Sequence, residues 1–162
     1  MRNKIRVGIG CDVHALVEGR KLMLGGVEIA FEKGLSGWSD ADVVLHAVID
    51  ALLCAAALGD IGTHFPPGDM EYREISSLDL LTRVKSLVNE KGWTIGNIDV
   101  AIMAEAPKLK PYMQSMVDNI SRALSIEAAD VSVKAGTNEG LGFVGRGEGI
   151  AAQAVALLEH EE

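Results

Sequence analysis

The sequence lacks several features that would place the chain in other classes of protein. It has only two cysteines, Cys11 and Cys54, which excludes a disulfide framework and fits free thiols in a reducing compartment. A single disulfide between them is the less favoured alternative. No uninterrupted apolar run reaches the roughly 18 residues of a membrane span, and residues 1–5 lack the apolar stretch of a signal peptide. We therefore expect a cytoplasmic protein that does not bind membranes.

Basic residues are in the minority. The chain has 15 Lys and Arg against 23 Asp and Glu, a formal net charge of −8. This balance argues against a nucleic-acid partner, because such binding needs a basic face to neutralise phosphates. It does not exclude a small phosphorylated ligand, since one metal ion and a few basic side chains reverse the sign of charge locally.

The chain contains no linker, repeat or low-complexity tract. At 162 residues it is expected to form a single domain over residues 1–162 and to bury roughly 70% of its unfolded surface. The periodicity predicts strands at 4–17 and 21–30, joined by a hairpin turn at 18–20, and at 100–104 and 131–135. Helices are expected at 40–58, with Ser39 as N-cap, and at 74–91, 111–124 and 149–159. These elements favour an α+β fold, a single-domain α/β sandwich with a mixed sheet covered by helices on one face.

Three candidate metal ligands stand out. Asp12 and His14 lie two apart in a strand and therefore project to the same side, and His46 lies in the following helix. If that helix packs on this side of the strand, one carboxylate and two imidazoles converge. Three protein ligands with a fourth position open are typical of catalytic zinc. The alternative for His46 is a core histidine bonded to a backbone carbonyl, but burial of Asp12 without a charge partner would be costly.

Two further carboxylates lie one helical turn from His46. Asp50 follows it and Asp42 precedes it on the same face, so either could accept the second ring proton and fix the tautomer of His46. We expect this outer role for Asp50. For Asp42 the favoured alternative is a capping or solvated carboxylate.

A glycine-rich run near the C-terminus, residues 134–149, permits close backbone approach to phosphates. Within it, residues 140–145 match the dinucleotide pattern G-x-G-x-x-G, but too little chain follows for a dinucleotide fold. Thr137 and Glu139 could face a phosphate from the end of a strand, the carboxylate through Mg²⁺. The alternative is a glycine-rich turn with surface residues.

Two loops are candidate pocket walls. Residues 104–108 follow a buried strand, where ligands commonly lie in α/β folds, and Lys108 could meet a phosphate. Residues 60–62 offer the Asp60 carboxylate beside exposed backbone, as a ribose diol would need. Each segment taken alone is more often an ordinary loop.

The motifs together resemble the 2-C-methyl-D-erythritol 2,4-cyclodiphosphate synthase family. The resemblance runs in collinear order through nearly the whole chain. It rests on residues 10–14, 39–46, 55–62, 65–66, 106–108, 134–135, 137, 139 and 145–151. It implies a lyase of the non-mevalonate isoprenoid pathway that converts 4-diphosphocytidyl-2-C-methyl-D-erythritol 2-phosphate to the cyclic diphosphate and releases CMP. It also implies a homotrimer, with active sites between subunits and a central apolar cavity that could bind an isoprenoid diphosphate.

The resemblance implies roles for particular residues. Zinc would be held by Asp12, His14 and His46, and a second cation, Mg²⁺ or Mn²⁺, by Glu139. Thr137 matches the position that steadies the diphosphate in the transition state, and Trp38 stands where a second catalytic residue is expected. The substrate-binding positions implied are Asp12, His14, Trp38, Ser39, Asp60, Ile61, Gly62, Phe65, Asp69, Ala104, Pro107, Lys108, Gly136, Thr137, Asn138, Glu139, Phe143 and Arg146.

The sequence departs from the family pattern at two places. Trp38 stands where the family usually has His, and indole donates one hydrogen bond but neither accepts one nor carries charge. It could instead pack on Val43 ahead of the helix, or cover the methylerythritol part of the substrate. Pro67 and Gly68 stand where Asp and Thr are common, although Asp69 remains.

Two other functions stay open on the sequence alone. A metal-dependent phosphohydrolase could use the same zinc to activate water. A non-catalytic trimeric module could bind nucleotides or isoprenoid diphosphates and use the metal structurally.

Overall fold

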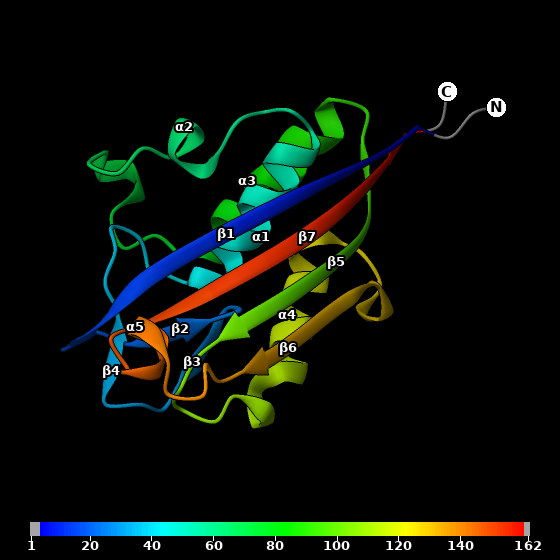
Figure 1. Cartoon of the computed structure of the whole chain (residues 1–162). Helices are drawn as coiled ribbons and strands as arrows, with labels where there is room; N and C mark the ends of the chain where they lie inside the picture. The colour runs from blue at the N-terminus through cyan, green and yellow to red at the C-terminus, as the bar shows by residue number, and fades with distance from the viewer. Residues whose placement is uncertain (1–3, 161–162) are drawn as a thin grey trace.

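The computed structural model describes residues 4–160. A five-stranded mixed sheet forms one layer of the molecule, at the front of the view in Figure 1. The strand order is β4-β1-β7-β5-β6. The strands are β1 Lys4–Glu18, β4 Lys33–Leu35, β5 Thr94–Met103, β6 Val131–Gly136 and β7 Gly149–His160. The β5–β6 pair is parallel and the other pairs are antiparallel, so the predicted mixed sheet is confirmed.

The three long helices lie on one face of this sheet, behind it in Figure 1. They are α1 Val43–Ala55, α3 Ser77–Glu90 and α4 Met113–Leu124. Helix α1 packs on β1 and β7 and is covered in turn by α3, which explains why nearly all of its residues are buried. The short elements are α2 Ile61–His64, α5 Gly142–Gly145 and the 3-10 turns η1 Met70–Tyr72, η2 Lys110–Tyr112 and η3 Ala128–Asp130.

The helix predicted at 149–159 is wrong. This segment is β7, the central strand, paired with β1 on one side and β5 on the other. Its alanines favour a helix intrinsically, but its burial alternates with a period of two. Tertiary pairing therefore overrides the intrinsic propensity. The buried positions, which face the helices, are Ile150, Ala152, Ala154, Ala156 and Leu158.

The hairpin predicted between 4–17 and 21–30 is also wrong. Strand β1 pairs with β4, with Leu16 opposite Leu35. Residues 21–30 instead form their own two-stranded unit, β2 Leu22–Leu24 and β3 Val27–Ile29. The pair Gly25-Gly26 is its turn, with φ angles of 58° and 72° that favour glycine.

The remaining elements were predicted with shifted ends. The helix predicted at 40–58 spans Val43–Ala55, and its N-cap is Asp42 instead of Ser39, since the Asp42 carboxylate accepts from the Leu45 amide. The helix predicted at 74–91 spans Ser77–Glu90, and the strand predicted at 100–104 extends over Thr94–Met103. Pro111 lies in the 3-10 turn η2 directly before α4.

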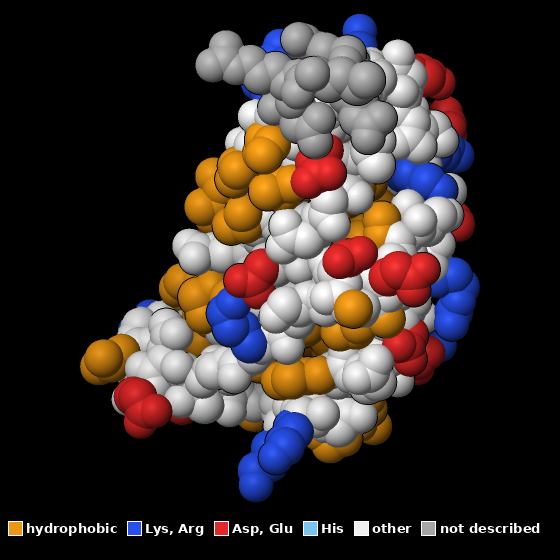
Figure 2. Space-filling view, turned by 90° about the vertical axis from the view of Figure 1, so that its right-hand side faces the viewer, with side chains coloured by type: hydrophobic (Ala, Val, Ile, Leu, Met, Phe, Trp, Pro, Cys, Tyr) orange, Lys and Arg blue, Asp and Glu red, His pale blue; other side chains and the backbone are white. Residues whose placement is uncertain are grey.

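The face of β1 opposite the helices is apolar and exposed. Its side chains Ile5, Val7, Ile9 and Val13 are each more than half exposed, and Val155 of the neighbouring β7 is 42% exposed. In Figure 2, hydrophobic side chains gather toward the left of the view, where this face of the sheet lies, whereas charged side chains spread over the centre and right. Within residues 4–160, no helix has the length and apolarity needed to cross a membrane.

Candidate metal centre and substrate clefts

The three candidate metal ligands come together where β1 meets the N-terminal half of α1. Asp12 and His14 lie on β1 with their side chains on the helix-covered side, as the strand period requires. His46 lies in the first turns of α1 and is 9% exposed. The convergence predicted from sequence is therefore present.

The ligand atoms point at one another. Asp12 Oδ2 lies 2.9 Å from His14 Nε2 and 3.0 Å from His46 Nδ1, and the two ring nitrogens are 3.2 Å apart. Ligand atoms about 2.1 Å from a tetrahedral zinc are about 3.4 Å from one another, so these separations need to grow by only a few tenths of an ångström. The donor set, one carboxylate and two imidazoles, fits a divalent cation with an open coordination position.

The electrostatics of the cluster also favour a cation. Burial alone would raise the pKa of Asp12, but its hydrogen bonds to His14 and His46 outweigh burial and hold this pKa well below its ordinary value. Burial would lower the pKa of His14, but the bond to Asp12 and its charge raise this pKa overall. The Asp12 carboxylate thus supplies a field that attracts positive charge to the point where the three side chains meet.

The second ring nitrogen of His46 does not face Asp50, so the outer role expected for Asp50 is wrong. His46 Nε2 lies 3.1 Å from Ser39 Oγ and 3.0 Å from Ser77 Oγ. Asp50 instead accepts from the amide of Ile61 at 2.8 Å and positions the start of α2. Asp50 lies one helical turn from His46 on the same side of α1, but the Asp50 carboxylate binds the segment that follows the helix.

Asp42 has a structural role. Its carboxylate is fully buried and accepts from the amides of Gly25, Gly26 and Leu45 at 2.9, 2.7 and 3.1 Å. It therefore joins the β2–β3 turn to the N-terminus of α1. The capping alternative for Asp42 is confirmed, and the solvated one is wrong.

A cleft of about 230 Å³ opens beside the metal ligands. Seven predicted site residues besides His46 lie around it: Asp12, His14, Trp38, Ser39, Ile61, Gly62 and Phe65. Pro67, Tyr72 and Leu80 complete its lining. Tyr72 and Leu80 were missed, because nothing in their local sequence distinguishes them from ordinary apolar residues of a loop and a helix.

Trp38 links two walls of this cleft. Its indole N–H donates to the backbone carbonyl of Asp69 at 2.8 Å and so ties the loop before α1 to the loop that carries η1. The carboxylate of Asp69 accepts from the amide of Glu71 and caps η1. Asp60, next to the cleft residue Ile61, caps α2 by accepting from the amide and hydroxyl of Thr63, and these bonds lower its pKa.

A second cleft of about 210 Å³ lies at the ends of β5 and β6. Among its lining are five predicted site residues, Ala104, Pro107, Lys108, Gly136 and Thr137. The bond between Ala106 and Pro107 is cis, and the amide of Ala104 donates to the Gly136 carbonyl.

The turn after β6 contains Thr137, Asn138 and Glu139, three further predicted site residues. Thr137 Oγ1 lies 3.2 Å from Glu139 Oε1, and the amide of Asn138 donates to Glu105. Both Thr137 and Glu139 are exposed to solvent. A threonine hydroxyl and a carboxylate therefore stand side by side at the end of β6, as the sequence indicated.

Phe143 and Arg146 lie beyond this turn. Phe143 lines a third cleft of about 330 Å³, which also includes Asp12 and Asn138. Arg146 is exposed and paired with Glu148 through two bonds of 2.9 and 3.0 Å.

One chain does not place all the predicted residues in one cleft. The metal ligands on β1 and the second cleft, at the ends of β5 and β6, are separated in the sheet by β7. The two strand spacings from β1 to β5 amount to about 10 Å, and the three from β1 to β6 to about 14 Å. The predicted site is therefore split between two parts of the chain.

The fold and the site define an α+β protein with a three-ligand centre that could hold a divalent cation beside a cleft. Comparison with known proteins then identifies the family. The model of the YgbB family matches residues 5–159, and the chain belongs to this family.

Curated relatives of this chain include proteins named 2-C-methyl-D-erythritol 2,4-cyclodiphosphate synthase. The protein of Alkaliphilus metalliredigens is 60% identical over 154 residues, which are 95% of this chain and 97% of that protein. That of Clostridium acetobutylicum is 55% identical over 154 residues, 95% of this chain and 99% of that one.

Solved structures of proteins named IspF or IspDF also match the chain. The bifunctional IspDF from Campylobacter jejuni matches with a TM-score of 0.95 and 42% identity over 99% of this chain and 44% of that chain. The CDP complex of IspF from Plasmodium falciparum matches with a TM-score of 0.86 and 33% identity over all of both chains.

Proposed function

We propose that the chain converts 4-diphosphocytidyl-2-C-methyl-D-erythritol 2-phosphate to 2-C-methyl-D-erythritol 2,4-cyclodiphosphate with release of CMP, as a lyase of the non-mevalonate isoprenoid pathway. The observation that carries this proposal is the Asp12, His14 and His46 centre beside a cleft. It occurs in a chain that matches synthases of this name at 55–60% identity over nearly its full length.

The reaction asks the protein mainly for positioning. The 2-phosphate oxygen attacks the β-phosphorus in line and CMP leaves, and the attacking oxygen is already ionised at neutral pH. The apolar walls contributed by Phe65, Tyr72 and Trp38 would hold the methylerythritol part close to the metal ligands. Thr137 would steady the diphosphate through its hydroxyl. Trp38 would act by holding the loop of Asp69 against the cleft, through the hydrogen bond from its indole N–H to the Asp69 carbonyl.

We assign zinc to Asp12, His14 and His46, because two imidazoles and one carboxylate with an open position suit that ion. We assign Mg²⁺ or Mn²⁺ to Glu139, since hard cations prefer carboxylate and phosphate oxygens. When bound, such ions polarise phosphoryl oxygens and neutralise charge, which lets an acidic protein bind a substrate with three phosphoryl groups.

We assign the cytidine end of the substrate to the second cleft. Backbone groups of Ala104 and Pro107 would read the base, and Lys108 would meet a phosphate. A solved relative, IspF of Plasmodium falciparum, is described as a CDP complex. The ribose would contact Asp60 and Gly62. The remaining contacts that we assign are Ser39, Ile61, Asp69, Gly136, Asn138, Phe143 and Arg146.

We infer that the active enzyme is a homotrimer with active sites between subunits. The separation of the two clefts in one chain supports this arrangement, because a neighbouring copy would bring its second cleft to the metal centre. The exposed apolar face of β1 supports it too, since contiguous exposed apolar side chains mark interfaces. Packed around a three-fold axis, that face would enclose a cavity that could bind an isoprenoid diphosphate near Phe143 and Arg146.

We place the enzyme in the cytoplasm. Both thiols, Cys11 and Cys54, are free and exposed, which suits a reducing compartment.

Product analysis tests the function. Purified protein with zinc and Mg²⁺ is incubated with the cytidine diphosphate-linked substrate, and products are followed by phosphorus NMR and chromatography. We expect the cyclic diphosphate and an equal amount of CMP. Inorganic phosphate in place of the cyclic product would indicate a phosphohydrolase, and binding without turnover would indicate a non-catalytic module.

A further inference from the structure

We propose that Ser77 and Asp40 are positioning residues that fix the ring and tautomer of His46. This inference deepens the proposed function, because it rests on a cation at Asp12, His14 and His46. Ser77 lies outside the segments that carry the resemblance, and Asp40, which lies in the segment 39–46, is not among the residues expected to bind the metal or the substrate.

The contact between Ser77 and His46 is buried. Ser77, the first residue of α3, is 0% exposed, and its Oγ lies 3.0 Å from His46 Nε2. Helix α3 packs on α1 and so brings into contact two residues that are 31 positions apart in the sequence. This nitrogen is the one that points away from Asp12 and His14.

Asp40 sets the direction of the Ser77 hydroxyl. The hydroxyl donates to Asp40 Oδ1, and the Ser77 amide donates to Asp40 Oδ2 at 2.9 Å. Oδ1 also accepts from the amide of Asp42 at 3.1 Å. An ionised carboxylate can only accept, so the single hydroxyl proton of Ser77 is directed toward Asp40.

The tautomer of His46 follows from this direction. With its proton directed to Asp40, Ser77 offers His46 a lone pair, and His46 Nε2 must carry the ring proton. When a cation is bound, the lone pair therefore lies on Nδ1, the nitrogen that is 3.0 Å from Asp12 Oδ2, and points at the ion; without a cation, the contact with the Asp12 carboxylate needs a proton on Nδ1. A metal ion at Nδ1 requires this tautomer, and the acceptor groups behind the ring also fix the orientation of the imidazole.

Ser39 also contacts His46 but does not determine its tautomer. Its Oγ lies 3.1 Å from His46 Nε2 and accepts from the amide of Ala41, but no carboxylate among residues 4–160 bonds to its hydroxyl. The Ser39 hydroxyl can therefore donate or accept. The ordering group is Ser77.

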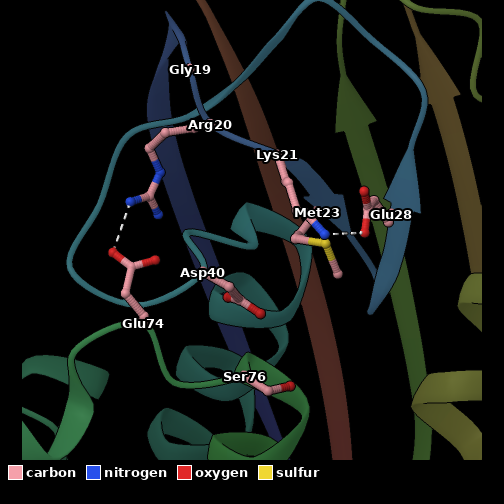
Figure 3. A pocket seen from close by; sticks show the side chains of 8 residues that line it. All are labelled: Gly19, Arg20, Lys21, Met23, Glu28, Asp40, Glu74 and Ser76. Atoms are coloured by element: carbon pink, nitrogen blue, oxygen red, sulfur yellow. Dashed lines mark hydrogen bonds and ion pairs between the residues drawn. The ribbon is translucent and has the colours of Figure 1, made fainter.

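Asp40 is itself held from several sides. Its amide donates to the carbonyl of Ile75 at 3.1 Å. Figure 3 shows its side chain on the wall of a charged cleft of about 510 Å³, near the ion pair of Arg20 and Glu74. Arg20 also donates to the Ser39 carbonyl at 2.8 Å, which fixes the segment that precedes α1. The segment that carries Asp40 is thus held by its own backbone and by Arg20, through bonds that do not involve His46.

The test compares Ser77→Ala with Ser76→Ala in the full chain. Ser76 is the neighbouring serine and caps α3 by accepting from the Leu78 amide, but it does not contact His46. Zinc affinity is measured by competition with a chromophoric chelator, and the cobalt-substituted proteins are compared by visible absorption. Ser77→Ala should bind zinc about 10- to 100-fold more weakly and change the cobalt spectrum. Ser76→Ala should lose stability only.

Two more variants test the same proposal if Ser77→Ala does not fold. Ser77→Thr keeps a hydroxyl and should retain most of the zinc affinity. Asp40→Asn keeps one acceptor oxygen but opposes the Ser77 amide with a second donor, and it should weaken zinc binding in the same direction by a smaller factor.

The outcomes separate the two claims. Suppose that the unchanged chain binds zinc, that His46→Ala abolishes this binding, and that Ser77→Ala binds zinc as well as Ser76→Ala does. The proposed role of Ser77 and Asp40 is then wrong, and the metal centre is retained. If the unchanged chain binds no zinc at this centre, the proposed function fails and the pair fails with it. A selective loss in Ser77→Ala and Asp40→Asn supports the pair.

Discussion

Gly10 on β1 lies directly against the backbone of Ala47 on α1. A Cβ added at Gly10 would be 2.0 Å from the Ala47 carbonyl oxygen and 2.6 Å from the Ala51 amide nitrogen. Only a residue without a side chain allows this approach. It sets the distance between strand and helix, and therefore between Asp12, two residues along β1, and His46, the neighbour of Ala47.

Gly10→Ala should consequently damage both stability and the metal centre. We expect a loss of about 1–3 kcal/mol in the free energy of unfolding, the usual cost of overpacking, together with weaker zinc binding. Urea unfolding and chelator competition measure the two effects. The control is Gly136→Ala, because a Cβ at this strand residue would meet nothing within 4 Å. Equal stability of the two variants would contradict the close approach.

Asp42→Ala should be among the most destabilising single changes. It leaves the amides of Gly25, Gly26 and Leu45 without their acceptor in a buried place. Each unsatisfied group costs about 1–3 kcal/mol, so we expect a loss of about 3 kcal/mol or more. Asp42→Asn keeps one acceptor oxygen and should lose less. Urea midpoints of both variants close to that of the unchanged chain would refute this role.

Trp38 should act on substrate binding more than on turnover. Trp38→Phe keeps an aromatic wall but removes the N–H that binds the Asp69 carbonyl, so KM should rise while kcat changes little. Trp38→His should give an active enzyme with altered substrate affinity. Steady-state kinetics with the cytidine diphosphate-linked substrate measures both. Inactivity of Trp38→His would count against this position as part of the pocket.

Active sites shared between subunits should allow complementation. His46→Ala and Lys108→Ala should each be nearly inactive, since one lacks a metal ligand and the other a phosphate contact. After unfolding and joint refolding of equal amounts, random mixed trimers should have roughly a quarter of their sites with both residues intact. Activity that reappears only in the mixture supports the shared site. No recovery in mixed oligomers verified by mass spectrometry would contradict it.

The sequence predicted the metal ligands because their spacing reflects local geometry. Asp12 and His14 share a face of any strand, and the apolar run around His46 is long enough to identify a helix. Their meeting required only that the helix pack on that face of the strand.

Interactions between distant segments were not predictable in this way. Asp50 lies one turn from His46, yet the partner of the ring is Ser77, which the packing of α3 on α1 brings into contact. Residues 149–159 were misassigned because alanine suits a helix intrinsically. In the fold, small side chains on β7 allow α1 to pack closely on the sheet.

Anomalous diffraction at the zinc absorption edge tests the metal centre most directly. In crystals of the protein grown with zinc, we expect one strong peak about 2.0–2.2 Å from Asp12 Oδ2, His14 Nε2 and His46 Nδ1, and none at this place in His46→Ala crystals. A peak elsewhere, or three ligand atoms that do not surround a common ion, would contradict the account.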